Sequence, residues 1–220
     1  MVSGSWFVVR GSWLVVVTLR FLRFLVFLVV ALASACSSGP AAPDESSYVQ
    51  QIEAWHAARD QQFRADKDPI PANKKATLLP IPYFPVDPNY TVAAALRLGQ
   101  ERPVVPMPTS TGTIRRYQRI GVLEFTFQGQ SLSLGAFVPE GTREIEQLFV
   151  PFVDGTSGKQ TYPAGRYLDI FPTTTGLYTI DFNKAYNPYC AYNETYECPY
   201  PPPSNRLKIE IRAGEKAPGA

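Results

Sequence analysis

Hydrophobic residues follow three patterns along the chain: an unbroken apolar run near the N-terminus, a helical spacing after it, and short runs that alternate with polar residues over most of the remainder. The helical spacing lies between positions 47 and 66, where Ser47 and Gln50 also form a capping-box pattern. Its apolar face consists of Tyr48, Ile52, Trp55 and Phe63. We therefore expect one N-terminal amphipathic helix.

The short alternating runs predict β-strands. Alternation is clearest at 123–127 and 132–134, and the turn sequence Gln128-Gly129-Gln130 between them indicates a hairpin. Frequent prolines between positions 69 and 88 exclude a long helix there. The expected strands span residues 90–98, 113–119, 122–128, 131–137, 147–153, 166–171, 177–182 and 207–212. We predict a mainly β fold with an N-terminal helix, built as a single antiparallel β-sandwich or small barrel.

The N-terminal apolar run has the features of a secretory signal. Arg20 and Arg23 precede twelve uncharged residues, 24–35, which end on small residues before Cys36. Such a run is too short to cross a bilayer as a helix, which takes about 20 apolar residues. An uncleaved anchor over 13–35 is the alternative, but it would place both arginines in hydrocarbon at about 2.5–3.5 kcal/mol each. The run therefore indicates an exported protein.

The residues that end this run, Leu32-Ala33-Ser34-Ala35-Cys36, resemble a lipobox, although leucine is more usual at the position of Ala33. In such a motif the cysteine carries the lipid, with acyl chains such as palmitate. We expect a signal peptide over 1–35, a lipidated flexible tether over 36–46 and a single β-rich domain over 47–220. The predicted location is the cell envelope, with the domain anchored to a membrane through Cys36 and facing the periplasm or the exterior.

Length and charge narrow the classes of function. The 220 residues, 45% of them hydrophobic, suffice for one well-packed domain. The formal net charge is +2, but three of the 21 basic residues and none of the acidic ones precede Cys36, which leaves 18 basic and 19 acidic residues from there on. A nearly neutral domain lacks the clustered positive charge that nucleic-acid binding needs. No nucleic-acid partner is expected.

Two cysteines remain besides Cys36. Cys190 and Cys198 form an even pair in an oxidising compartment, and we expect a disulfide between them. A metal site is the alternative, but His56 is the only histidine of the chain, so a metal would lack ligands. No metal or cofactor is therefore expected, and catalytic designs that depend on histidine are disfavoured.

Polar residues gather first between positions 152 and 167, where Asp154, Tyr162 and Arg166 accompany glycines and threonines. The backbone amides of such a turn suit an anion, and an arginine adds a two-pronged clamp for carboxylate or phosphate. The alternative is an ordinary hairpin loop in which Arg166 pairs with Asp154 or Asp181.

A second gathering lies before Cys190. Asp181 and Asn183 are two residues apart on an expected strand, so both project from one face, where they could orient a ligand or bind a hard cation. Asn187 follows them. The alternative is that these side chains satisfy the backbone amides of a loop.

Both gatherings belong to longer motifs. These are Phe152-x-Asp154-x-Thr156-x-Gly158, Thr161-Tyr162-x-x-Gly165-Arg166-Tyr167, Asp181-Phe-Asn183-Lys-Ala-Tyr186-Asn187-Pro-Tyr-Cys190, Pro202-Pro203-x-Asn205-Arg206 and Ala213-Gly-Glu215-Lys216. Together they resemble the bacterial family catalogued as domain of unknown function 1684, over about residues 48–216, and Ser204 stands where members often have glutamate. That family has no established activity. The resemblance implies only that these polar clusters recur in one architecture and meet in a shared pocket.

We interpret the domain first as a non-catalytic envelope module that binds a small or polymeric ligand, or another envelope protein. The alternative is an envelope hydrolase or lyase that uses Asp181 or Glu215 as acid or base and Arg166 as an anion clamp. The candidate ligand-binding residues are Asp154, Tyr162, Arg166, Asp181, Asn183, Asn187 and Glu215. Convergence on an open concavity would favour a site. Side chains that are all paired and covered would favour a structural role.

Overall fold

The computed structural model describes residues 44–65 and 69–219. The predicted signal peptide, Cys36 and the tether up to residue 43 lie outside the described residues. Within them, helix α2 (Glu45–Arg64) confirms the predicted N-terminal helix and buries Ile52, His56 and Phe63. None of the described helices is long and apolar enough to cross a membrane.

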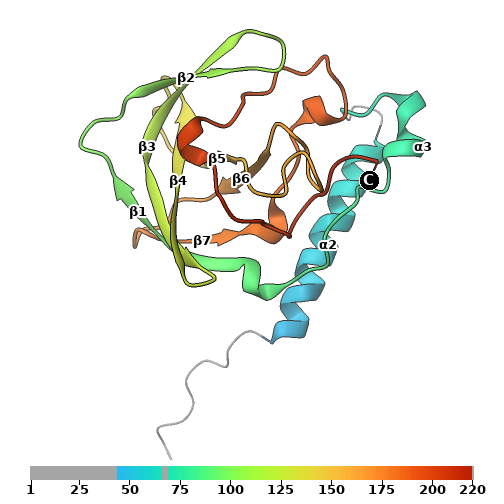
Figure 1. Cartoon of the computed structure of the whole chain (residues 1–220), viewed down its shortest axis with the longest axis horizontal. Helices are drawn as coiled ribbons and strands as arrows, with labels where there is room; N and C mark the ends of the chain where they lie inside the picture. Colours follow the sequence, from blue (N-terminus) through green and yellow to red (C-terminus); the bar gives the residue numbers. More distant parts are fainter. Residues whose placement is uncertain (1–43, 66–68, 220) are drawn as a thin grey trace, which may run out of the picture. The chain divides into compact units, whose positions relative to one another are not determined.

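Seven strands form one curled antiparallel sheet (Figure 1). They are β1 (Thr91–Leu98), β2 (Val104–Pro108), β3 (Ile114–Phe127), β4 (Gln130–Pro139), β5 (Leu148–Phe152), β6 (Arg166–Ile170) and β7 (Leu177–Asp181). The hydrogen-bonded order is β6-β5-β4-β3-β1-β7, and β2 pairs with β3 outside this path. Because the end strands β6 and β7 also approach each other, the sheet closes into a half-barrel. The predicted fold class is confirmed, in its barrel-like form.

Short helical turns fill the connections, and no long helix occupies the proline-rich stretch. They are η1 (Ala72–Lys74), α3 (Lys75–Leu78), η2 (Pro88–Tyr90), η3 (Phe182–Lys184), η4 (Tyr189–Ala191) and η5 (Pro203–Asn205). In Figure 1, α2 stands on the side of the domain away from β3 and β4, and the C-terminal segment runs back beside it.

The β3–β4 hairpin forms where the sequence predicts it. Phe127 pairs with Gln130, and the two turn residues have positive φ angles, 50° at Gln128 and 74° at Gly129, as a tight hairpin turn requires. The two strands expected over 113–119 and 122–128 are one continuous strand. The register shifts between Arg119 and Gly121, which is a β-bulge that bends β3 without ending it.

Two strand predictions are wrong. β2 was not among the expected strands. Pro106 lies within it, and the sheet tolerates this proline because β2 pairs only with β3. The strand expected over 207–212 does not form, although Leu207 and Ile211 are buried and the residues between them are more exposed. Part of its backbone bonding goes to side chains, as shown below.

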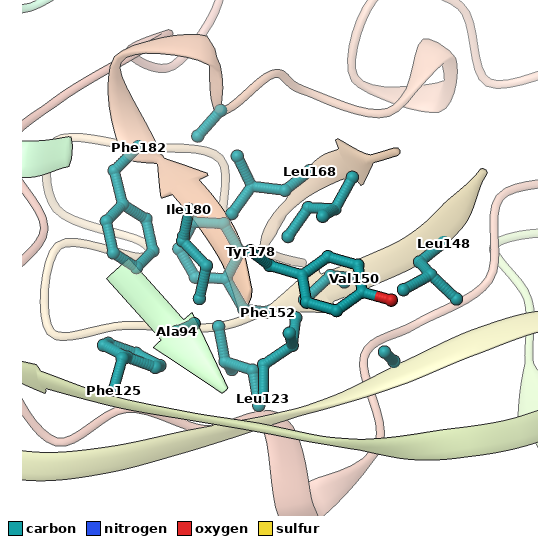
Figure 2. Close-up of a cluster of buried hydrophobic side chains, with 14 of the residues drawn as sticks. Ala94, Leu123, Phe125, Leu148, Val150, Phe152, Leu168, Tyr178, Ile180 and Phe182 are labelled. Carbon is teal, nitrogen blue, oxygen red and sulfur yellow. The ribbon is translucent and has the colours of Figure 1, made fainter. Parts of the chain in front are cut away.

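The sheet encloses one main hydrophobic core. Figure 2 shows that its side chains come from the middle and from both ends of the strand order, for example Leu123 of β3, Leu168 of β6 and Ile180 of β7. A smaller cluster joins Phe63 of α2 to Tyr192 of the C-terminal region. Helix α2 therefore packs on the loops that follow β7.

Candidate functional site

Arg166 and Asp154 form a buried ion pair rather than an open clamp. Their side chains are 0% and 1% exposed, and Arg166 Nη2 lies 3.3 Å from Asp154 Oδ1. The other acceptors of this guanidinium are the carbonyl oxygens of Ile211, Ala213 and Glu215. Burial lowers the pKa of Arg166, and the charge of Asp154 opposes that shift. Both residues are thus paired and covered, which favours the structural alternative.

This network explains why residues 207–212 are not a strand. The Ile211 amide donates to Asp154 Oδ2 at 2.7 Å, and the Ile211 carbonyl accepts from Arg166 Nη2 at 2.8 Å. Side chains therefore replace part of the backbone ladder that a neighbouring strand would supply. The C-terminal segment is held on the core by these two residues.

Glu215 and Asn187 meet in a second network, beside α2. Glu215 is 0% exposed, pairs through Oε1 with Arg59 Nε, and accepts at Oε2 from the Asn187 amide at 2.6 Å and the Tyr192 hydroxyl at 2.7 Å. The Asn187 side chain donates to the Lys216 carbonyl at 2.7 Å. Glu215 therefore has no open face for a substrate.

Asp181 and Asn183 form a third network, which attaches the start of α2 to the sheet. Asp181 Oδ1 accepts from the Tyr48 hydroxyl at 2.9 Å, and Asn183 Nδ2 donates to that hydroxyl at 2.9 Å. Asn183 also exchanges two hydrogen bonds with the backbone of Asp87. This is the predicted alternative in which Asx side chains satisfy loop backbone.

Hydrogen bonds link Asp154, Arg166, Glu215 and Asn187 to one another, and they link Asp181 to Asn183 in a different network. The structure does not bring all seven predicted residues into one pocket. Tyr162, the last of them, is half-buried, and its hydroxyl lies 3.9 Å from Cys190 Sγ. Within the described residues, no three His, Cys, Asp or Glu side chains are grouped closely enough to hold a metal ion.

Cys190 and Cys198 are both buried and carry free thiols in this structure, so the expected disulfide is not formed in it. They are nonetheless adjacent, because the Cys190 amide donates to Cys198 Sγ at 3.1 Å. The hydrogen bond from Cys198, aided by Ser110 and Tyr162, lowers the pKa of Cys190 from 9.0 to about 6. A thiolate at Cys190 is the reactive form for disulfide exchange.

A cavity of about 490 Å³ is lined in part by Cys198, and half of its lining residues are aromatic. The lining residues are Trp55, Arg59, Arg115, Tyr117, Phe149, Tyr167, Asp169, Tyr186, Pro188, Tyr189, Tyr196, Glu197, Cys198 and Pro199. They come from α2, β3, β5, β6 and the loops after β7. The volume is within the range of small-molecule sites, roughly 300–1,000 Å³.

The aromatic rings of the cavity contact each other in sequence. Tyr117 stacks on Phe149 at 5.2 Å between ring centroids, and Phe149 meets Tyr167 edge to face at 4.7 Å. Tyr167 meets Tyr186 edge to face at 5.8 Å. Tyr196 meets Tyr189 in the same way at 5.3 Å. These contacts join the rings of Tyr117, Phe149, Tyr167 and Tyr186 into one continuous wall.

Charged groups occupy two parts of the lining. Arg59 lies over the Tyr186 ring at 4.8 Å, and the Tyr186 hydroxyl donates to Asp169 Oδ2 at 2.9 Å. Elsewhere, Arg115 Nε donates to Glu197 at 2.6 Å, in an ion pair whose side chains are 49% and 33% exposed. Asp169 keeps contact with solvent, and partial desolvation by the surrounding protein raises its pKa.

Arg59 has one unused donor beside this cavity. Its side chain is 10% exposed, and its Nη2 atom is buried without a hydrogen-bond partner among the described residues. The charge of Arg59 is already neutralised by Glu215, which does not line the cavity. Arg59 can therefore offer a ligand a hydrogen-bond donor, but its positive charge is already neutralised.

Comparison with known proteins decides the family. The model of the family described as "Protein of unknown function (DUF1684)" matches residues 77–216. The chain belongs to this family. An uncharacterised protein of Haloarcula marismortui, solved by NMR in solution, is 36% identical, with 78% of this chain and 95% of that chain covered and a TM-score of 0.62. The comparison with curated proteins gives no match.

The DUF1684 match contains all seven predicted site residues and most of the cavity lining. Trp55 and Arg59 precede the matched residues, so α2 completes the cavity from outside them. The sequence offered one signal for these two positions, the spacing of Trp55 and Arg59 on one helix. It offered none for Asp169 or Glu197, which become neighbours of the cavity only through the folding of the sheet.

Proposed function

We propose that this DUF1684 domain is a non-catalytic ligand-binding module and that its ligand occupies the aromatic cavity. The observation that carries the proposal is a cavity of about 490 Å³ that is lined by aromatic rings in mutual contact and by Arg59, whose buried Nη2 donor has no hydrogen-bond partner among the described residues. Leaving such a donor unsatisfied costs about 1–3 kcal/mol. A ligand oxygen that reaches it on a small side-chain adjustment recovers part of that cost.

Binding is favoured over catalysis because the acids considered for proton transfer are engaged elsewhere. Glu215 is fully buried with three donors, and Asp181 is bonded to Tyr48 and Asn183. The carboxylates of the cavity also have protein partners, Tyr186 for Asp169 and Arg115 for Glu197. We assign no catalytic residue.

We further propose that the protein is exported and anchored to a membrane through a lipid on Cys36, with the domain in the cell envelope. The proposal is supported by the apolar run and the lipobox-like residues before Cys36. In the host, metabolic labelling with a palmitate analogue is expected to mark the protein, and Cys36→Ser is expected to abolish the label. A labelled Cys36→Ser variant would refute the anchor.

In that oxidising compartment we propose that Cys190 and Cys198 form a disulfide. Their adjacency and the lowered pKa of Cys190 support it. The bond would join the segment of Tyr189 to that of Tyr196 and Glu197, which line the cavity. Mass analysis of the exported protein, alkylated without reductant, is expected to show both cysteines blocked from alkylation.

The binding proposal is tested with the full chain and a library of sugars, amino acids, carboxylates and amines. Trp55 lines the cavity, and the other two tryptophans, Trp6 and Trp13, precede Cys36, so a fluorescence change that Trp55→Ala removes reports on this site. Binding of at least one compound is expected to shift that fluorescence and raise the Tm. The Trp55→Ala variant is expected to lose the ligand-induced rise in Tm. The Phe171→Ala variant, changed at an exposed aromatic residue, is expected to keep that rise. Equal responses of both variants would refute the cavity as the site.

A further inference from the structure

The cavity lining carries two positive and two negative side chains, and Arg59 also pairs with Glu215, which does not line the cavity. Arg59 and Arg115 carry positive charge, and Asp169 and Glu197 carry negative charge. Arg59 is near Asp169 through the Tyr186 ring, and Arg115 is bonded to Glu197. Each part of the cavity therefore presents a donor and an acceptor together. A ligand with a net charge would meet a like charge wherever it lay.

Side chains of these types also divide the hydrogen-bonding roles. Arginine only donates, and an ionised carboxylate only accepts. A hydroxyl group does both, so neighbouring hydroxyls on one ring can accept from an arginine and donate to a carboxylate. A carboxylate ligand satisfies only the arginines, and an amine satisfies only the acids.

The aromatic walls select for a flat, partly apolar body between these groups. The rings of Tyr117, Phe149, Tyr167 and Tyr186 follow each other in contact, and Trp55 also lines the cavity. The C–H faces of a sugar ring stack on such rings, while its hydroxyls project from the edge. A cavity of about 490 Å³ has room for a short segment of such rings.

We propose that the cavity binds a neutral carbohydrate, through aromatic stacking and through the Arg59/Asp169 and Arg115/Glu197 pairs. This inference rests on the proposed binding function and names its ligand class. The ligand is a short oligosaccharide or the end of a longer neutral glycan.

The test uses the full chain in a detergent without a sugar headgroup, followed by calorimetry and by Trp55 fluorescence. The probes are maltotetraose, cellotetraose and chitotetraose as neutral chains, with tetragalacturonate and a glucosamine tetramer as charged ones. At least one neutral chain is expected to bind, and the charged chains are expected to bind at least about tenfold more weakly.

Variants then tie binding to the cavity. Trp55→Ala, followed by calorimetry, is expected to weaken the neutral chain by about tenfold or more, because an aromatic anchor is lost. The matched change Phe171→Ala, at an exposed aromatic outside the cavity, is expected to have no effect. Asp169→Asn removes one negative charge, so the affinity for tetragalacturonate relative to the neutral chain is expected to rise severalfold.

The outcomes separate this inference from the function on which it rests. If a charged chain binds more tightly than the neutral chains, the neutral carbohydrate is refuted as the ligand. The same holds if an amino acid, carboxylate or amine binds and Trp55→Ala abolishes that binding. In both cases the proposed binding function stands. Failure of all neutral chains likewise overturns the carbohydrate. If no compound of any class binds in the cavity, the proposed function falls as well.

Discussion

Arg166 and Arg59 are two buried arginines in similar surroundings with different consequences. Each pairs with a buried carboxylate, Asp154 or Glu215, and each lies over an aromatic ring. Each also leaves one nitrogen without a partner among the described residues, Nε in Arg166 and Nη2 in Arg59. Only Arg59 borders a cavity.

The difference lies in what covers the guanidinium. Arg166 is enclosed by the carbonyls of the C-terminal segment, so its hydrogen bonds hold the chain together. Arg59 is enclosed on one side by Glu215 and by rings, and on the other it lines open space. Of these two buried ion pairs, only that of Arg59 adjoins a space that a ligand can enter.

The largest loss of stability is expected from replacing Arg166. Arg166→Met leaves Asp154 as a buried, unpaired charge and removes the donors of three carbonyls, at a cost near the upper end of about 3–5 kcal/mol in the free energy of unfolding. Urea denaturation of the full chain measures this cost. Arg97→Met, at an exposed arginine paired with Glu124, is the control and is expected to change stability little. Equal costs at both positions would remove the structural role of Arg166.

A smaller loss is expected at the partner of Arg59. Glu215→Gln keeps the size of the side chain but removes the charge that pairs with Arg59, at a cost near the lower end of about 3–5 kcal/mol in the free energy of unfolding. The positive charge of Arg59 is then no longer neutralised beside the cavity, so the same variant is expected to bind anions better than the wild type does. Denaturation and calorimetry with tetragalacturonate measure the two effects. Loss of stability without a gain for anions would show that Arg59 is as enclosed as Arg166.

Much of the fold followed from the sequence because its signals are local. The alternation at 123–127 and 132–134 and the turn Gln128-Gly129 predicted the hairpin, and the apolar spacing after Ser47 predicted α2. The failures have non-local causes. Residues 207–212 alternate as a strand does, but Asp154 and Arg166 take part of their backbone hydrogen bonds. β2 carries a proline that only an unshared sheet edge tolerates.

The candidate site was less accessible to sequence reasoning. The sequence draws attention to three charged residues among glycines and loops, Asp154, Arg166 and Glu215. In the structure their ion pairs and hydrogen bonds hold the C-terminal segment and α2 in place. The cavity is lined by tyrosines spread from Tyr117 to Tyr196, and such residues are indistinguishable from core aromatics before the sheet curls. A concavity is a property of the assembled strands, not of any one motif.

A pH effect is expected at His56, on the same helix as Arg59. His56 stacks on Tyr83 at 3.7 Å and contacts the Asn183 carbonyl at 3.0 Å, and burial lowers its pKa below 6.5. Below pH 6.5 the unfolded chain therefore takes up the proton first, so stability falls as the pH falls, by at most about 1.4 kcal/mol per pH unit. His56→Gln is expected to flatten the free energy of unfolding between pH 7.5 and pH 5.5 relative to the wild type. Parallel profiles would show that His56 is solvated in both states.

The smallest effect on stability, and the sharpest on function, is expected at the exposed pair of the cavity. Replacing Arg115 and Glu197 together by glutamine keeps the net charge and removes a largely exposed ion pair, so the free energy of unfolding is expected to stay unchanged. The matched change of Arg97 and Glu124, a more exposed pair outside the cavity, is expected to be equally silent in denaturation. The two double variants are expected to differ in calorimetry alone, where only the first weakens the ligand of the cavity. If both double variants bind that ligand equally well, the Arg115/Glu197 pair does not contribute to ligand binding. Recognition then depends on Arg59, Asp169 and the aromatic rings.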